Sequence, residues 1–176
     1  MTQEMGTTRK ALQTAIQMEI DGKEFYLKAS ETSHNELGKN LLRKLADEED
    51  LHRQKFEEIY QSISSQKSWP KTDFKSDGGQ ELRTIFARAT DEMEPILDTL
   101  PNELDAVETA MAMENRSYDF YKGHSKTATY DMERDFYEAL AAQESEHHRI
   151  LLDYYEFLKN PAAWFVQKEH PSLDGS

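Results

Sequence analysis

Two copies of one short motif, a glutamate followed three residues later by a histidine, could do chemistry in this sequence. The first copy, EDLH, begins at Glu49, and the second, ESEH, begins at Glu144. A lone glutamate, Glu19 or Glu114, precedes each copy by thirty residues. Carboxylates bind hard metal ions and imidazole binds iron, manganese and zinc. On a helix, positions i and i+3 lie over one turn, so each motif could offer two ligands to one ion.

The motifs belong to a longer internal repeat. Residues 11–65 align with residues 106–160 without a gap, at an offset of 95 residues. Polar positions match as well as apolar ones, so more than a hydrophobic pattern repeats. Identical pairs include Ala15 and Ala110, Met18 and Met113, Phe25 and Phe120, Tyr26 and Tyr121, Leu45 and Leu140, His52 and His147, and Tyr60 and Tyr155.

Long helices must position these residues. Apolar residues recur at three- and four-residue steps, and no stretch of comparable length alternates with period two. The chain is therefore expected to be all-α. The helical segments are 5–32, 35–66, 102–127 and 130–159.

The short polar turns at 33–35 and 128–130 predict two antiparallel hairpins, 5–66 and 102–160. The link 67–101 contains proline and glycine and a short helical pattern at 80–90, so we expect it to be a crossover. Residues 161–176 begin with a proline, which a helix cannot easily pass, and are expected to form a tail in which Trp164 and Phe165 pack. The predicted architecture is one domain, a four-helix bundle.

The turns lie midway between the paired glutamates. A chain that climbs one helix for fifteen residues and descends the next travels roughly 22 Å each way. Glu19 should therefore face Glu49, and Glu114 should face Glu144. All four lie on apolar stripes that point inward. Four unpaired carboxylates in an apolar centre would cost many kcal/mol, so either they are protonated or something cationic neutralises them. Two divalent cations would balance four carboxylates.

Other interpretations of single residues stay open. A decayed repeat could keep the pattern without the ion. Tyr26 and Tyr121 follow the lone glutamates by two helical turns, and each is either a core aromatic residue or a partner that hydrogen-bonds a ligand carboxylate or passes an electron. Glu48 and Gln143 could orient ligands or simply belong to a solvated face.

Charge and composition exclude several classes of function. The 176 residues carry 21 Lys and Arg against 34 Asp and Glu, a formal charge of −13, which disfavours nucleic acid and anionic membranes as partners. The absence of cysteine excludes disulfides, thiolate zinc sites and iron–sulfur clusters within this chain. With no apolar leader or membrane span in the sequence, we expect a cytoplasmic protein.

At these motifs the chain resembles the rubrerythrin-like branch of the ferritin-like superfamily. The resemblance covers most of residues 10–160 and is carried by AIQMEIDGKEFY with LADEEDLHRQKF and by AMAMENRSYDFY with AAQESEHHRILL. It implies a non-haem centre of two iron ions, for which manganese or zinc could substitute, that reacts with peroxide or dioxygen in oxidative-stress defence. The metal ligands that it implies are Glu19, Glu49, His52, Glu114, Glu144 and His147.

Two departures from the family pattern qualify this expectation. The chain has no cysteine-bound rubredoxin-like domain, so a separate electron donor, such as a rubredoxin-type protein, is expected. Ser117 stands where rubrerythrins tend to carry a further glutamate, which leaves six ligands, as in a bacterioferritin-type ferroxidase centre. The resemblance thus implies a diiron oxidoreductase of peroxidase or ferroxidase type, with a metal-binding or iron-handling protein without turnover as the alternative. A homodimer is one option for the oligomeric state.

Overall fold

A computed structural model describes residues 3–66, 68–72, 74, 77–92, 101–161 and 163 of the chain. Within these residues it contains five helices and no strand. The helices are α1 (Gln3–Thr32), α2 (Glu36–Gln66), α3 (Gln80–Glu92), α4 (Pro101–Thr127) and α5 (Asp131–Lys159).

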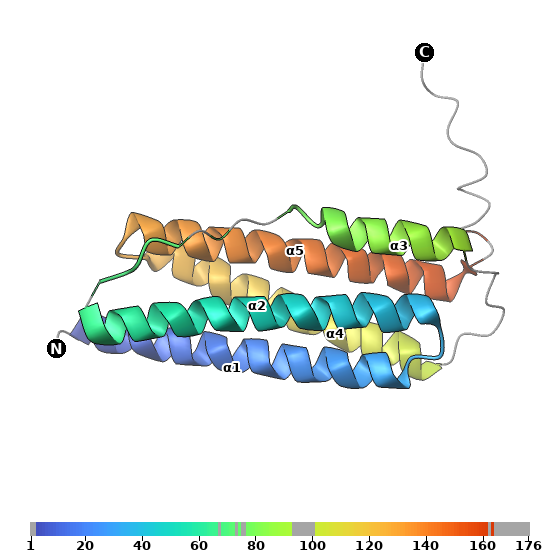
Figure 1. Cartoon of the computed structure of the whole chain (residues 1–176), viewed down its shortest axis with the longest axis horizontal. Helices are drawn as coiled ribbons and strands as arrows, with labels where there is room; N and C mark the ends of the chain where they lie inside the picture. The colour runs from blue at the N-terminus through green and yellow to red at the C-terminus, as the bar shows by residue number, and fades with distance from the viewer. Residues whose placement is uncertain are drawn as a thin grey trace, which may run out of the picture.

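Four of these helices form the predicted bundle. The pairs α1–α2 and α4–α5 are antiparallel hairpins that lie against each other, and α3 packs on α2 and α5 (Figure 1). The all-α fold with two hairpins and a crossover is therefore confirmed, and the short helix expected at 80–90 is α3. Every helix begins and ends within two residues of its predicted bounds. Trp164 and Phe165, expected to pack in the tail, lie outside the described residues.

The spacing of buried residues explains why these segments pack as a bundle. In α1 the buried positions alternate in steps of three and four, which puts them on one stripe along the helix. The same alternation runs through α2 and α5. The α1 stripe consists of Leu12, Ala15, Glu19, Gly22, Tyr26 and Ala29. Charged and apolar side chains thus occupy equivalent core positions.

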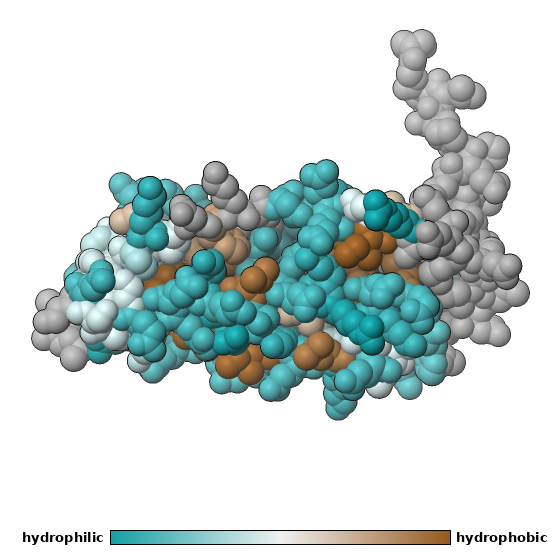
Figure 2. Space-filling view, viewed as in Figure 1, coloured by the Kyte–Doolittle hydropathy of each residue, from teal (hydrophilic) through white to brown (hydrophobic). Residues whose placement is uncertain are grey.

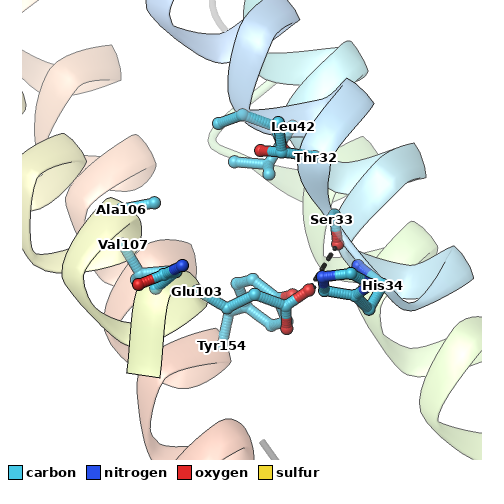
Figure 3. Close-up of a pocket in the computed structure, with 10 residues that line it drawn as sticks. Thr32, Ser33, His34, Leu42, Glu103, Ala106, Val107 and Tyr154 are labelled. Carbon is cyan, nitrogen blue, oxygen red and sulfur yellow. Dashed lines mark hydrogen bonds between the residues drawn. The ribbon is translucent and has the colours of Figure 1, made fainter. Parts of the chain in front are cut away.

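The turn between α1 and α2 is tied to the start of α4. The Asn35 side chain accepts the backbone N–H of Gly38 at 2.6 Å and so caps α2. The Glu103 carboxylate accepts hydrogen bonds from the Ser33 hydroxyl and the Asn35 amide, each at 3.2 Å, and from the His34 backbone N–H. A cavity of about 240 Å³ lies beside this turn (Figure 3). Both Glu103 oxygens thus hydrogen-bond the turn of the first hairpin from α4, and this links the two hairpins.

The core has two apolar clusters with a polar layer between them. One cluster contains Tyr26, Leu45 and Ile150, and the other contains Ala15, Phe56 and Tyr121, among other residues. On α1, Glu19 lies between a residue of one cluster and a residue of the other, and the same holds for the Glu-x-x-His motifs on α2 and α5. The candidate ligands therefore form a layer across the middle of the bundle.

The face of the bundle that Figure 2 shows is mainly polar in its described part. On the face that Figure 2 shows, hydrophobic residues form small separate groups on a largely hydrophilic surface. Among the described helices, none combines the length with the apolar content that crossing a membrane requires.

Candidate metal centre

The structure brings all six candidate ligands together at the centre of the bundle. They divide into two groups that share Glu49 and Glu144, and within each group the potential ligand atoms lie within 4.8 Å of one another. None of the six candidate ligand residues exposes more than 4% of its surface. One group is Glu19, Glu49, His52 and Glu144, and the other is Glu49, Glu114, Glu144 and His147.

Several buried atoms of this cluster lack the partners that burial normally demands. Among the described residues, Glu49 Oε1, both oxygens of Glu144 and His147 Nδ1 are buried without a hydrogen-bond partner. The two imidazole Nδ1 atoms lie 3.3 Å from Glu144 oxygens, without the alignment of a hydrogen bond. Buried polar atoms are almost always satisfied, so these atoms need a further partner. Unpaired carboxylate and imidazole lone pairs that converge on one place fit a divalent metal ion.

Both histidines present the same nitrogen to the cluster. His52 Nδ1 lies 3.3 Å from Glu19 Oε2, and His147 Nδ1 lies 3.2 Å from Glu49 Oε1. Each Nε2 points the other way, across the interface between α2 and α5. When Nε2 carries the proton, the Nδ1 lone pair is free to bind a metal ion.

Each outward Nε2 is held by the residue that precedes the motif on the opposite helix. His147 Nε2–H donates to Glu48 Oε2 at 2.6 Å, and His52 Nε2–H donates to Gln143 Oε1. For Glu48 and Gln143, the structure therefore favours the ligand-orienting alternative over a solvated face. The sequence could not decide this, because both side chains point sideways from the ligand stripe.

Two tyrosine hydroxyls close the cluster, and each reaches across to the other hairpin. Tyr26 donates to Glu114 Oε1, and Tyr121 donates to Glu19 Oε1. Burial, followed by the nearby carboxylate charges, raises the pKa of both tyrosines, so the phenol protons stay in place at neutral pH. Both tyrosines are core residues that also hydrogen-bond a candidate ligand. A role in electron transfer stays a prediction.

Without metal, protons must balance the charges in this cluster. Burial and the surrounding carboxylates raise the pKa of Glu49 well above its usual value, and burial, followed by the Glu144 charge, raises that of Glu114 to about 8. Burial alone would lower the pKa of His52 and His147, but neighbouring carboxylates raise it well above the ordinary value. Burial also opposes the charge of Glu144, but Glu114 and the two imidazoles hold its pKa below the usual range.

The metal-free protein is expected to lose stability as the pH rises from about 5 to about 8. In this range the folded state keeps protons on Glu49, Glu114 and the histidines that the unfolded chain releases, so the free energy of unfolding falls. Melting temperature measured with a chelator should fall by several degrees, at about 2–4 °C per kcal/mol. Saturating Zn(II) should reverse the trend, because metal and protons compete. A melting temperature that rises with pH in the chelated protein would contradict this assignment.

The absence of a side chain at Gly22 on α1 leaves room for the Glu49 carboxylate. A Cβ atom added at Gly22 would lie 2.6 Å from Glu49 Oε2, closer than real Cβ contacts allow. Glu49 therefore approaches the α1 backbone more closely than any side chain at this position would permit. The corresponding residue in the second half of the repeat is Ser117.

Replacing Gly22 with alanine should displace the Glu49 carboxylate while leaving the bundle folded. We expect the affinity for Zn(II), measured by calorimetry, to fall by about tenfold or more, the effect typical of disturbing the support of a metal ligand. Gly123→Ala on α4 is the matched control, because nothing lies within 4 Å of a Cβ added there. Equal zinc affinity in both variants would show that Gly22 does not position Glu49.

These features define a class, a helical bundle with buried glutamates and histidines shared among its helices, as in ferritin-like proteins. A family model described as Rubrerythrin matches residues 10–155, so the chain belongs to the rubrerythrin family. Its structure is similar to that of a hypothetical protein from Pyrococcus furiosus, with a TM-score of 0.64 and 24% identity. That match covers 86% of this chain and 90% of the other, and supports the fold alone. No match was found among curated proteins.

Proposed function

We propose that this protein binds two iron ions in the buried cluster and reacts there with peroxide or dioxygen. The observation that carries the proposal is the set of buried, converging carboxylate and imidazole atoms without hydrogen-bond partners among the described residues, in a chain of the rubrerythrin family. Manganese or zinc could occupy the same ligand set, since the donor types suit all three metals.

The proposed ligand roles follow from the two groups. Glu49 and Glu144 belong to both groups and would bridge the ions. Glu19 and Glu114 belong to one group each and would be terminal ligands, while His52 and His147 would each bind one ion through Nδ1.

When bound, a pair of iron ions supplies the electrons that reduce peroxide or dioxygen. The chain's own contribution is to position ligands and exclude water. The hydroxyls of Tyr26 and Tyr121 fix the terminal carboxylates and keep their own protons. Burial of all six ligand residues keeps bulk water out of the site. With no cysteine of its own to hold an electron-transfer iron, we place the electron donor in a separate protein.

Anaerobic loading with Fe(II), followed by peroxide or air, tests the proposal directly. We expect two Fe(II) per chain and, on oxidation, the near-ultraviolet absorption of a coupled ferric pair. Wild-type protein that binds no Fe(II), or whose ions show only the spectrum of isolated ferric iron, would overturn it.

The second candidate is a metal-binding or iron-handling protein without sustained turnover. The six-ligand set, with Ser117 in place of a further glutamate, favours it as an alternative. Repeated cycles of peroxide reduction with a rubredoxin-type donor and its reductase separate the two functions. Many turnovers per chain support the oxidoreductase, whereas a single slow oxidation that no reductase reverses supports the iron-handling protein.

A further inference from the structure

The two proposed metal positions have the same types of ligand, but the residues that hydrogen-bond their histidines differ. The 95-residue offset relates Glu19 to Glu114, Glu49 to Glu144 and His52 to His147, so each position would receive one terminal glutamate, two shared glutamates and one histidine. The same offset relates Glu48 to Gln143. At this one contact, the outward nitrogen of His147 meets a carboxylate, whereas that of His52 meets a neutral amide.

A carboxylate and an amide act differently on a histidine ligand. A carboxylate that accepts the imidazole N–H makes the other nitrogen a stronger donor to metal, and it adds negative charge near the ion. The Glu48 side chain is only 13% exposed, and its bond to His147 Nε2 is 2.6 Å long, so solvent screens this contact weakly. An amide accepts the same hydrogen bond without a formal charge.

Another charge difference in the motif is neutralised locally. Asp50 corresponds to Ser145 in the second copy, and it is held 2.9 Å from Lys23 Nζ and 2.9 Å from Arg53 Nε. The two cations therefore balance the negative charge of Asp50 and reduce its effect on the site. Phe74 lies edge-on against the His52 ring but carries no charge. The pair Glu48 and Gln143 is a charge difference that touches the histidine ligands themselves.

We propose that Glu48 makes the two metal positions unequal, so that the position ligated by His147 binds a divalent ion more tightly and fills first. This inference rests on the proposed metal site. Glu48 and Gln143 act here as positioning residues through the histidines. Losing such a partner typically lowers metal affinity about 10- to 100-fold, so a difference of that order between the two positions is expected.

Zinc titration of the full chain, labelled with ¹⁵N-histidine, tests the order of filling. Zn(II) is added in half-equivalent steps while NMR follows the imidazole nitrogens, assigned with His52→Gln and His147→Gln variants. In the wild-type protein, His147 Nδ1 should shift during the first equivalent and His52 Nδ1 during the second. Simultaneous shifts, or His52 shifting first, would overturn the inference.

Variants of the two outer partners separate this role from a structural one. Glu48→Gln should weaken the tighter step about 10- to 100-fold and make the two steps coincide, because both histidines then meet amides. The exchange Glu48→Gln with Gln143→Glu should reverse the order, so that His52 shifts first. A reversed order supports the inference, because loss of packing cannot invert a binding order. An unchanged order in that double variant contradicts it. If neither histidine shifts in the wild-type protein, the proposed metal site itself is wrong.

Discussion

Replacing Glu144 with alanine is expected to leave the protein unable to hold either metal ion. Glu144 is completely buried and belongs to both ligand groups, as does Glu49. Truncating either side chain therefore removes a ligand from both positions at once. Metal analysis after gel filtration of zinc- or iron-loaded protein should show two ions per chain in the wild type and none tightly held in Glu144→Ala or Glu49→Ala.

Substitutions of the terminal glutamates should behave differently. Glu19→Ala and Glu114→Ala each remove a ligand from one position, so one ion should be retained. Glu138→Ala, on the exposed side of α5, is the control for a lost carboxylate outside the cluster. Retention of two tightly bound ions by Glu144→Ala or Glu49→Ala would refute the bridging assignment.

Replacing Glu19, Glu49, Glu114 and Glu144 together with glutamine should abolish stabilisation by metal. A ligand that binds only the folded state at a thousandfold excess over Kd contributes about 4 kcal/mol, which corresponds to a rise in melting temperature on the order of 10 °C. The wild-type protein should show this rise with Zn(II) or Mn(II), and the fourfold variant should show none. Thermal melts with and without metal make the measurement.

The same variant should be no less stable than the metal-free wild type at pH 8. Amides carry no mutual repulsion, whereas the wild-type cluster must hold protons or place like charges together. Circular dichroism would verify that the helices are intact. If the folded variant keeps the full metal-dependent shift, the ions bind elsewhere and the proposed function loses its basis.

The helices and the meeting of the six residues could be predicted because both depend on periodic spacing. Steps of three and four residues mark the buried stripes, and the equal distances from Glu19 and Glu49 to the turn at 33–35 place both at one level of the bundle. The 95-residue repeat then assigns the same geometry to the second half. That these residues ligate metal stays a prediction for the experiments above.

Which individual side chains touch between packed helices could not be read from this spacing. Tyr26 shares a helix face with Glu19, yet its hydroxyl bonds Glu114 on the other hairpin. The partners of Glu48 and Gln143, like the close approach of Glu49 to Gly22, depend on how α2 packs against its neighbours. Periodicity gives the face of a helix but not the rotation and distance of the helix that it meets.

The division of ligands between the hairpins has a consequence for local unfolding. Each four-residue group draws side chains from both hairpins, so a bound ion would cross-link them in a chain that has no cysteine for a disulfide. The binding free energy is then concentrated at the seam between α1–α2 and α4–α5. Metal removal should therefore increase amide hydrogen exchange most in opening events that separate one hairpin from the other, and least in the fraying of helix ends.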